Sequence, residues 1–388
     1  MKRREFLKIA AGALIWQLNP LFWSSVRAME KVSQRTLVLI ELKGGNDGLN
    51  TLVPYTNERY YQLRSGLAVK RDTVLQLSEN LGFNPRLKAL MDAWEHKQLA
   101  IVAGVGYPQP NRSHFRSIEI WETGSSSSQY LQTGWLARIL PQMPEPSRAI
   151  ADGAAIGGDA GPLAGGDLRL VIMRNLKQFF RQARRVQQIE ASSQNPALKH
   201  LLSVQNDVYR AARELDQKTK IQLPSDVIFP KTIIGRHLQT AARLIAGDAA
   251  IPVIKVSHGG FDTHANQRSL HDRLLEQLAE AMSAFRIAVQ HMGRWDQVLV
   301  MTYSEFGRRP AENGSRGTDH GTAAPHLVMG GKVKGGLYGR QPSLQELENE
   351  DLKYSVDYRR VYTTVGRRWW GLNQEFLDGG PYPQIGFI

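Results

Sequence analysis

Charged side chains that could take part in a reaction follow the apolar run Val298–Met301. This run is too short for a helix and rich in branched residues, which predicts a buried strand. Glu305, Arg308 and Arg309 come directly after it, and a loop rich in Gly, Asn and Ser then leads to Asp319–His320. Ligands of open α/β sheets bind beyond the carboxyl ends of strands, so these groups indicate the edge of an active site. The alternative is a charged surface loop whose Asp–His pair only caps a turn.

Three other predicted strands lead into polar groups of the same kinds. The strand over residues 35–42 precedes the segment GGNDG, which contains Asp47, and the strand over 99–104 precedes Ser113. The strand over 251–256 precedes Asp262 and His264, which an extended segment can point in one direction because they are two residues apart. For Asp47 the alternative is ordinary turn chemistry, since Asn and Asp beside Gly are common in turns.

These groups could bind divalent metal ions. The chain contains no cysteine, so a metal must be held by His, Asp, Glu or hydroxyl groups. Oxygen and imidazole ligands without thiolate suit Zn²⁺, Mn²⁺, Mg²⁺ or Ca²⁺. Two such ions could generate a nucleophile and stabilise an anionic transition state, with arginines holding the nonreacting oxygens.

Ser113 lies just before a predicted helix over residues 115–122. A hydroxyl at that place experiences the helix dipole and free backbone N–H groups, which favour a bound anion or developing negative charge. The alternative is that Ser113 only caps the helix. Its position alone is consistent with both roles.

Predicted strands alternate with predicted helices along the rest of the chain. The further strands are expected over 149–156, 168–173 and 327–329, and the further helices over 85–98, 134–140, 233–246, 267–292 and 358–370. This order predicts an α/β fold, a three-layer α/β/α sandwich with a doubly wound, mostly parallel sheet. The 388 residues suit one large domain, expected over 29–388, or two smaller ones.

Residues 174–220 are predicted to form a charged helical insertion, interrupted near 192–196. The insertion could be a lid or an arm that binds a partner. The alternative is a solvated layer of packing against the core.

The first residues have the pattern of a twin-arginine signal, with Lys2–Lys8 before a mildly apolar run over 9–23 and small residues at Val26–Ala28. The run is too short and too polar for a stable membrane span. We therefore expect residues 1–28 to be a cleaved Tat signal, which makes the Tat translocase a partner and predicts a periplasmic or otherwise exported protein. The alternative is an amphipathic anchor that stays attached.

The formal net charge is +13, of which residues 1–28 contribute +4, so the remaining chain carries +9. Outside the cytoplasm, a basic surface more plausibly meets anionic envelope polymers or anionic substrates than nucleic acid. The sequence contains no nucleic-acid-binding motif with interleaved aromatic residues.

Five segments resemble a bacterial family of unknown function, often Tat-exported, in the alkaline phosphatase/sulfatase superfamily. They are GGNDGLN, NRSHFRSIEIWETG, HGGFDTHANQ, SEFGRR and GSRGTDHG, in the order of that family. The resemblance covers nearly the whole chain after the signal and implies an alkaline-phosphatase-like sandwich. Three features differ from the superfamily: Ser113 to Thr123 is one residue longer, Asp262 and His264 are closer together, and His326 follows the Asp–His pair by only six residues.

The resemblance also implies roles for individual residues. Asp47 corresponds to the first metal-binding Asp, and Asp319 with His320 completes that site. Asp262 and His264 correspond to ligands of the other metal, and Ser113 to the nucleophile.

The sequence thus predicts a metal-dependent hydrolase of phosphate or sulfate esters, acting on a small molecule or a glycan. Ser113 or a metal-activated hydroxide would attack in line, assisted by Arg308 or Arg309 and with Glu305 as a further catalytic group. The alternative is a noncatalytic envelope protein of the same fold that binds an anionic glycan or a protein partner.

Overall fold

The computed structural model describes residues 35–143, 149–185 and 195–388. The predicted signal over residues 1–28 lies outside the described residues. A nine-stranded sheet forms the centre, and its strands lie side by side in the order β13-β5-β12-β9-β1-β8-β6-β7, with β14 paired to β5. The bounds are β13 Gly336–Gly339, β5 Leu99–Gly106, β12 Ala324–Gly330, β9 Val298–Tyr303, β1 Thr36–Lys43, β8 Val253–Gly259, β6 Gly153–Ile156, β7 Leu170–Met173 and β14 Val356–Asp357.

Strand β1 is the middle of this sheet and is parallel to β8 on one side and β9 on the other. Its side chains alternate between two apolar layers: Val38 and Ile40 pack into one, and Leu37 and Leu39 into the other. A strand covered on both faces reads as a continuous apolar run, which is why the sequence predicts it well. Of the paired strands in this described sheet, β12 is antiparallel to both of its neighbours, β5 and β9.

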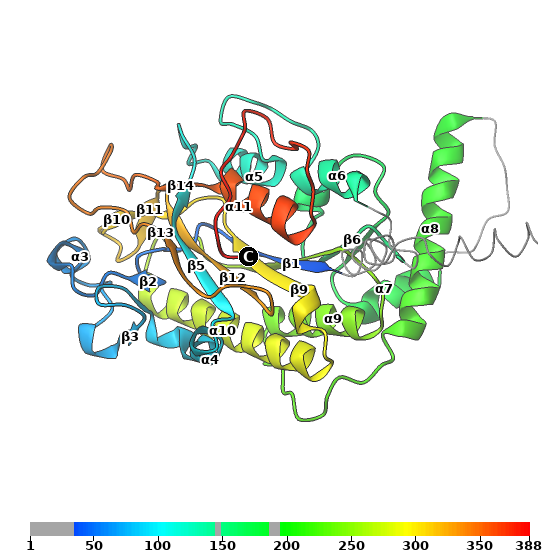
Figure 1. The fold of residues 1–388 in the computed structure, drawn as a ribbon, viewed down its shortest axis with the longest axis horizontal. Helices are drawn as coiled ribbons and strands as arrows, with labels where there is room; N and C mark the ends of the chain where they lie inside the picture. The colour runs from blue at the N-terminus through cyan, green and yellow to red at the C-terminus, as the bar shows by residue number, and fades with distance from the viewer. Residues whose placement is uncertain (1–34, 144–148, 186–194) are drawn as a thin grey trace, which may run out of the picture.

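Helices cover both faces of the sheet (Figure 1). One face carries the helices η2 Pro85–Leu90, α4 Met91–Glu95, α9 Ile233–Ala246 and α10 Gln267–His291. The other face carries α5 His114–Thr123, α6 Trp135–Ile139 and α11 Tyr358–Thr364. Helix α11 continues into a π turn over Val365–Trp369. Each helical layer closes its own buried cluster against the sheet. The predicted three-layer, mostly parallel α/β sandwich is confirmed.

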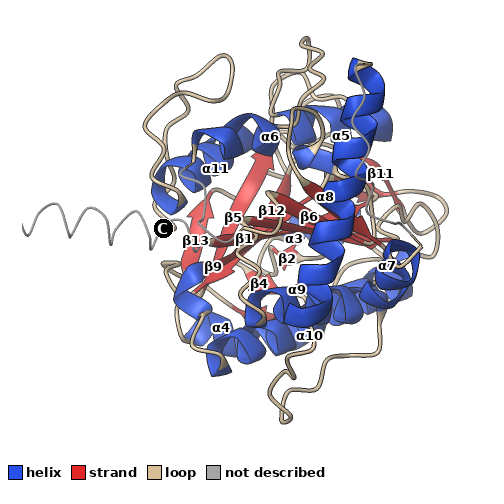
Figure 2. Cartoon of the chain, turned by 90° about the vertical axis from the view of Figure 1, so that its right-hand side faces the viewer, coloured by secondary structure: helices blue, strands red, loops and turns tan. Residues whose placement is uncertain are grey.

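Two helices occupy the predicted insertion. Helix α7, Leu176–Ala183, contacts β7, and α8, Pro196–Lys218, contacts both α7 and α9. Asn195 caps α8 with its side chain and Pro196 starts it, which accounts for the break expected near this point. Figure 2 shows α8 standing across the β6–β7 side of the sheet. The bounds of the insertion as a separate unit stay a prediction.

Short elements that the sequence did not predict lie at the carboxyl edge. They are the helix α3 Glu58–Leu63, a small sheet of β2 Leu52–Val53, β3 Leu75–Gln76 and β4 Gly82–Phe83, and a hairpin of β10 Arg308–Glu312 and β11 Thr318–His320. In the hairpin, Arg308 lies opposite His320. Two residues that are twelve positions apart in the chain therefore meet at one place.

The parallel strands bring their carboxyl ends to one edge. Lys43 at the end of β1 lies beside Gly259 at the end of β8, and Glu41 lies beside Tyr303 at the end of β9. The loops that carry the predicted site residues leave from these ends. Within the described residues, no helix combines the length and the apolar character needed to cross a membrane.

Candidate active site at the carboxyl edge of the sheet

A buried carboxylate orients a histidine at the start of α5. Glu305 follows β9, and its Oε1 accepts hydrogen bonds of 2.9 Å from the Gly44 backbone N–H and from Nδ1 of His114. Because a carboxylate only accepts, Nδ1 of His114 carries the proton. The Nε2 atom of His114 then points away from Glu305 and lies 3.3 Å from Oδ2 of Asp262.

Asp262, in the loop after β8, is the centre of the arrangement. Its Oδ1 lies 2.9 Å from Nε2 of His264, 3.1 Å from Nε2 of His320 and 2.6 Å from Nη2 of Arg308. Burial alone would raise the pKa of Asp262, but the hydrogen bond from Arg308 and the charge of Arg308 oppose it, and the pKa is lowered to about 2. This carboxylate is therefore an anion at any physiological pH.

His320 is held in one orientation in the same way as His114. Its Nδ1 lies 2.8 Å from the carbonyl oxygen of Arg112, which can only accept, so Nδ1 carries the proton. Burial lowers the pKa of His320, which favours the neutral ring with a lone pair on Nε2. That Nε2 faces Asp262 and lies 2.9 Å from Nε2 of His264.

Lone pairs and negative charge thus converge at one place. One ligand atom each from His114, Asp262 and His320 lies within 4.8 Å of the others, and His264 borders the group. With Nδ1 of each ring bound to an acceptor, the Nε2 atoms of His114 and His320 both face the carboxylate, and a proton or a cation between them makes this arrangement favourable. We refer to His114, Asp262 and His320 as the His–Asp cluster. Its donor set, with a backbone carbonyl and a carboxylate orienting the two rings, fits a divalent cation.

Arg308 ties the surrounding loops together. Its side chain is fully buried, and it donates to the carbonyl oxygens of Gly45 at 2.8 Å, Thr318 at 2.9 Å and Phe261 at 3.0 Å. The guanidinium therefore links the loops after β1 and β8 to the hairpin and places one charge beside Asp262. Arg309 points elsewhere, with its Nη1 3.0 Å from the exposed Glu350. The structure brings Arg308, and not Arg309, to the cluster.

Gly44 allows the loops after β1 and β8 to approach closely. Its φ of +118° lies outside the range that L side chains favour, and a Cβ at this position would lie 2.3 Å from the backbone nitrogen of Asp262. The glycine-rich segment after β1 is thus required by the contact that positions Asp262.

Asp47 lies in a separate buried ion pair. It is fully buried, as is its partner Arg64, and the Nη1–Oδ2 distance is 2.6 Å. Gln267 also donates to Oδ2, and the Leu49 N–H donates to Oδ1 at 3.2 Å. Burial raises the pKa of Asp47, but the Arg64 charge and hydrogen bond outweigh it, so the pKa is lowered. Both oxygens are satisfied by protein donors, and the structure does not bring Asp47 into the His–Asp cluster.

Asp319 and Ser113 lie at the margin of the cluster. Asp319 is exposed, accepts from Nδ2 of Asn313 at 3.0 Å and lies 3.7 Å from Nδ1 of His264. Ser113 is exposed at the N-cap position of α5, directly before His114, and its side chain makes no capping hydrogen bond. The capping role considered for Ser113 is therefore not seen in the structure.

His326, the only later histidine, lies in the core. It is buried in β12 against the ring of Trp121, and neither ring nitrogen has a hydrogen-bond partner in the described part of the chain. Burial lowers the pKa of His326 to about 3. It belongs to the apolar layer under α5 and α11 and does not contribute to the cluster.

Sequence reasoning did not identify His114 as a site residue. The sequence pattern indicated its neighbour Ser113, the N-cap of α5, whereas His114 is the first residue of that helix. The pairing with Glu305 depends on two segments 191 residues apart, and no local signal reveals it.

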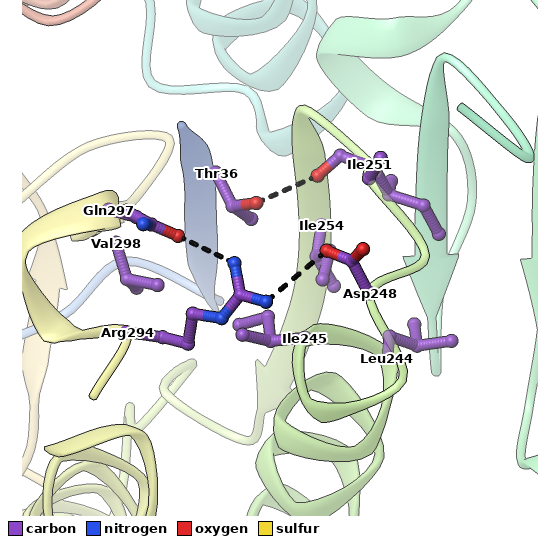
Figure 3. A pocket seen from close by; sticks show the side chains of 10 residues that line it. Thr36, Leu244, Ile245, Asp248, Ile251, Ile254, Arg294, Gln297 and Val298 are labelled. Atoms are coloured by element: carbon purple, nitrogen blue, oxygen red, sulfur yellow. Dashed lines mark hydrogen bonds and ion pairs between the residues drawn. The ribbon is translucent and has the colours of Figure 1, made fainter. Parts of the chain in front are cut away.

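A small hollow at the other edge of the sheet has a different character. It has a volume of about 30 Å³ and lies by Thr36 and Val298, where β1 and β9 begin. Figure 3 shows Arg294 in it, hydrogen-bonded to Gln297 and paired with Asp248. This hollow holds no convergent set of His and Asp side chains, so the carboxyl edge remains the candidate site.

Comparison with solved structures finds similar folds at low identity. Ps i-CgsB, solved in complex with k-i-k-neocarrahexaose, is 10% identical, with 89% of this chain and 74% of that chain covered and a TM-score of 0.43. PsFucS1 sulfatase from Pseudoalteromonas sp. is 9% identical over 92% and 74%, with a TM-score of 0.39. A protein in the alkaline phosphatase superfamily from Vibrio parahaemolyticus is 12% identical over 80% and 64%, with a TM-score of 0.35.

These similarities concern the fold alone. No curated protein matches the chain. The family model described as "Protein of unknown function (DUF1501)" matches residues 34–379 of the chain. Because that match covers most of the chain, the protein belongs to the DUF1501 family.

Proposed function

We propose that this protein is a hydrolase of phosphate or sulfate esters that uses one divalent cation held by His114, Asp262 and His320. The observation that carries the proposal is the convergence of these three ligand atoms within 4.8 Å at the carboxyl edge of the sheet. Glu305 and the Arg112 carbonyl group fix the two rings so that Nε2 of each faces the same point.

A cation bound there supplies Lewis-acid stabilisation of the ester oxygens. Ser113 is the group best placed to attack, since its hydroxyl is exposed, makes no cap bond and stands at the N-terminus of the ten-residue α5. Free N–H groups at that end favour an anionic ester. Arg308 holds Asp262 in position and keeps it ionised.

Asp47 as a metal ligand stays a prediction. A second cation at Asp47 would have to displace the Arg64 guanidinium from a fully buried ion pair. Leaving that guanidinium buried without its negatively charged partner is costly. We therefore favour one cation over two.

A second candidate is a noncatalytic protein of the same fold that binds an anionic ligand. The buried Arg308 already neutralises Asp262, and Arg64 already neutralises Asp47. Both carboxylates have a protein cation beside them, so the edge of the sheet can be stable without a metal.

The test is hydrolysis of aryl phosphates and aryl sulfates by the purified protein. Chelation should abolish activity, and one of Zn²⁺, Mn²⁺, Mg²⁺ or Ca²⁺ should restore it. His320→Ala should be inactive under all conditions, whereas His96→Ala, an exposed histidine on the other helical layer, should retain full activity. Activity that survives both chelation and His320→Ala would refute the proposal. A well-folded protein that binds these esters but never cleaves them would favour the noncatalytic candidate.

Export is proposed from the sequence. Replacement of Arg3 and Arg4 by Lys should trap the precursor in the cytoplasm, with fractionation and immunoblotting as the measurement. Unchanged export in a Tat-deficient strain would contradict a Tat signal over residues 1–28.

A further inference from the structure

A groove runs along the start of α10, which follows the loop that carries Asp262 and His264. Its volume is about 620 Å³. Four arginines and two carboxylates contribute to its lining: Arg86, Arg268, Arg273, Arg316, Asp272 and Glu276. We call this feature the arginine groove.

The carboxylates of the groove already have partners. Glu276 Oε1 pairs with Arg86 at 3.1 Å, and Asp272 Oδ1 accepts from Nδ2 of Asn84 at 3.0 Å. Arg268, Arg273 and Arg316 are exposed, and within the described ranges their side chains make no hydrogen bond or ion pair. Asn84 is a neutral donor, so Asp272 keeps its negative charge, and the four arginines and two carboxylates of the lining leave the groove with a net charge of +2. The exposed guanidiniums repel one another, and an anion with several charges relieves that repulsion.

The groove is joined to the cluster by the backbone. Arg268 follows the site residue His264 by four positions, and Arg316 precedes Asp319 by three. The N–H of Gln267 donates to the carbonyl oxygen of Arg316 at 2.9 Å, which fixes the turn of the hairpin against the start of α10. The groove therefore adjoins the segments that carry His264 and Asp319, and His264 in turn contacts His320 of the cluster.

We propose that the arginine groove binds an oligosaccharide that carries several sulfate or phosphate groups, while one of its esters occupies the His–Asp cluster. The placement of one ester in the His–Asp cluster rests on the proposed function, whereas the binding of the oligosaccharide to the groove does not. A single monoester would leave most of the groove empty. The residues that line the groove include no aromatic side chain on which a nucleic-acid base could stack, so a charged glycan fits better than a single-stranded nucleic acid.

The probe is a fluorescein-labelled dextran sulfate oligosaccharide, with uncharged dextran of the same length as its control. Fluorescence anisotropy of the purified, full-length protein at several salt concentrations gives the affinity and its salt dependence. The test variant combines Arg268→Gln, Arg273→Gln and Arg316→Gln. The charge-matched control combines Lys177→Gln and Arg181→Gln on α7 with Arg184→Gln at its C-cap, at the β7 edge of the sheet.

The groove variant should bind dextran sulfate at least about thirtyfold more weakly, and its log–log salt slope should fall by about two to three. The α7 control and the wild type should bind alike, and uncharged dextran should not bind. Equal losses in both variants would show nonspecific charge attraction and overturn the proposal. Binding of a single-stranded oligonucleotide as tight as that of dextran sulfate would overturn the choice of a glycan.

Two further results separate this inference from the proposed function. His320→Ala removes a contact with one ester but leaves the groove intact, so its affinity for dextran sulfate should fall by less than about threefold, far less than that of the groove variant. If the protein hydrolyses no ester but the groove variant still loses binding, the proposed hydrolysis fails and the binding site stands. If the groove variant hydrolyses a small aryl sulfate and binds dextran sulfate as the wild type does, the groove proposal fails and the proposed hydrolysis stands.

Discussion

Removal of the Arg64 guanidinium should expose how much of the fold depends on the buried Asp47. Arg64 donates to Asp47 Oδ2 at 2.6 Å, to Asn50 Oδ1 at 3.0 Å and to two backbone carbonyl oxygens of the β10 strand. The substitution Arg64→Met keeps most of the apolar stem and removes the charge and these donors. Asp47 would then be a buried anion without its cation.

The expected cost is about 3–5 kcal/mol of unfolding free energy, the range for breaking one partner out of a buried ion pair. The double variant Asp47→Asn with Arg64→Met removes both charges and should recover part of that loss. The pKa of Asp47 is lowered in the fold, so its stabilising effect is present above the unfolded pKa of 3.8 and is lost as pH falls through the lower folded pKa. The difference between wild type and Asp47→Asn should therefore shrink below about pH 4.

Urea denaturation at pH 7 and pH 3.5, each with and without chelator, measures these quantities. A loss below about 1 kcal/mol for Arg64→Met would refute the claim that this ion pair is structural. A loss that appears only when chelator is present would show that a metal at Asp47 takes over the role of Arg64, against the proposal of one cation.

Three further substitutions test other parts of the account. Burial raises the pKa of Glu122 from 4.5 to about 7, and Lys255 offsets this only in part because it also pairs with Glu41 and Asp159. As pH rises from 4.5 to 7, the unfolding free energy of the wild type should therefore fall by up to about 3 kcal/mol relative to that of Glu122→Gln. Parallel stability curves for the two proteins would contradict this. Ser113→Ala should lower ester hydrolysis by orders of magnitude and change unfolding free energy by less than about 0.5 kcal/mol, because the hydroxyl makes no cap bond; full activity would remove Ser113 from the mechanism. Gly44→Ala should destabilise the fold by more than about 2 kcal/mol and impair the site, as its Cβ would meet Asp262; normal stability in urea would show that the loops can separate.

The sequence predicted the sheet well because its strands are buried on both faces. Residues 37–40 and 298–301 are continuous apolar runs, and such runs are typical of central strands. It also placed Asp262, His264, Glu305, Arg308 and His320 near one another, since all follow strands whose carboxyl ends share an edge.

The remaining features depend on contacts between distant segments. The Asp47–Arg64 pair arises because α3 packs against the loop after β1, and nothing near either residue indicates it. The short hairpin of β10 and β11 lacks the apolar alternation that marks a strand, so the opposition of Arg308 and His320 was not expected. His114 was overlooked because its orientation is set by Glu305, which comes from another part of the chain.

Binding of a divalent cation to the His–Asp cluster is the claim on which the proposed function depends. Isothermal titration calorimetry of chelator-stripped protein with Zn²⁺ and Mn²⁺ measures it, with wild type, His114→Ala, His320→Ala and the exposed control His96→Ala compared. We expect one equivalent of metal for the wild type and the control, and at least about a hundredfold weaker binding for each cluster variant. Two equivalents in the wild type, unchanged affinity in His114→Ala or His320→Ala, or no binding at all would contradict the account.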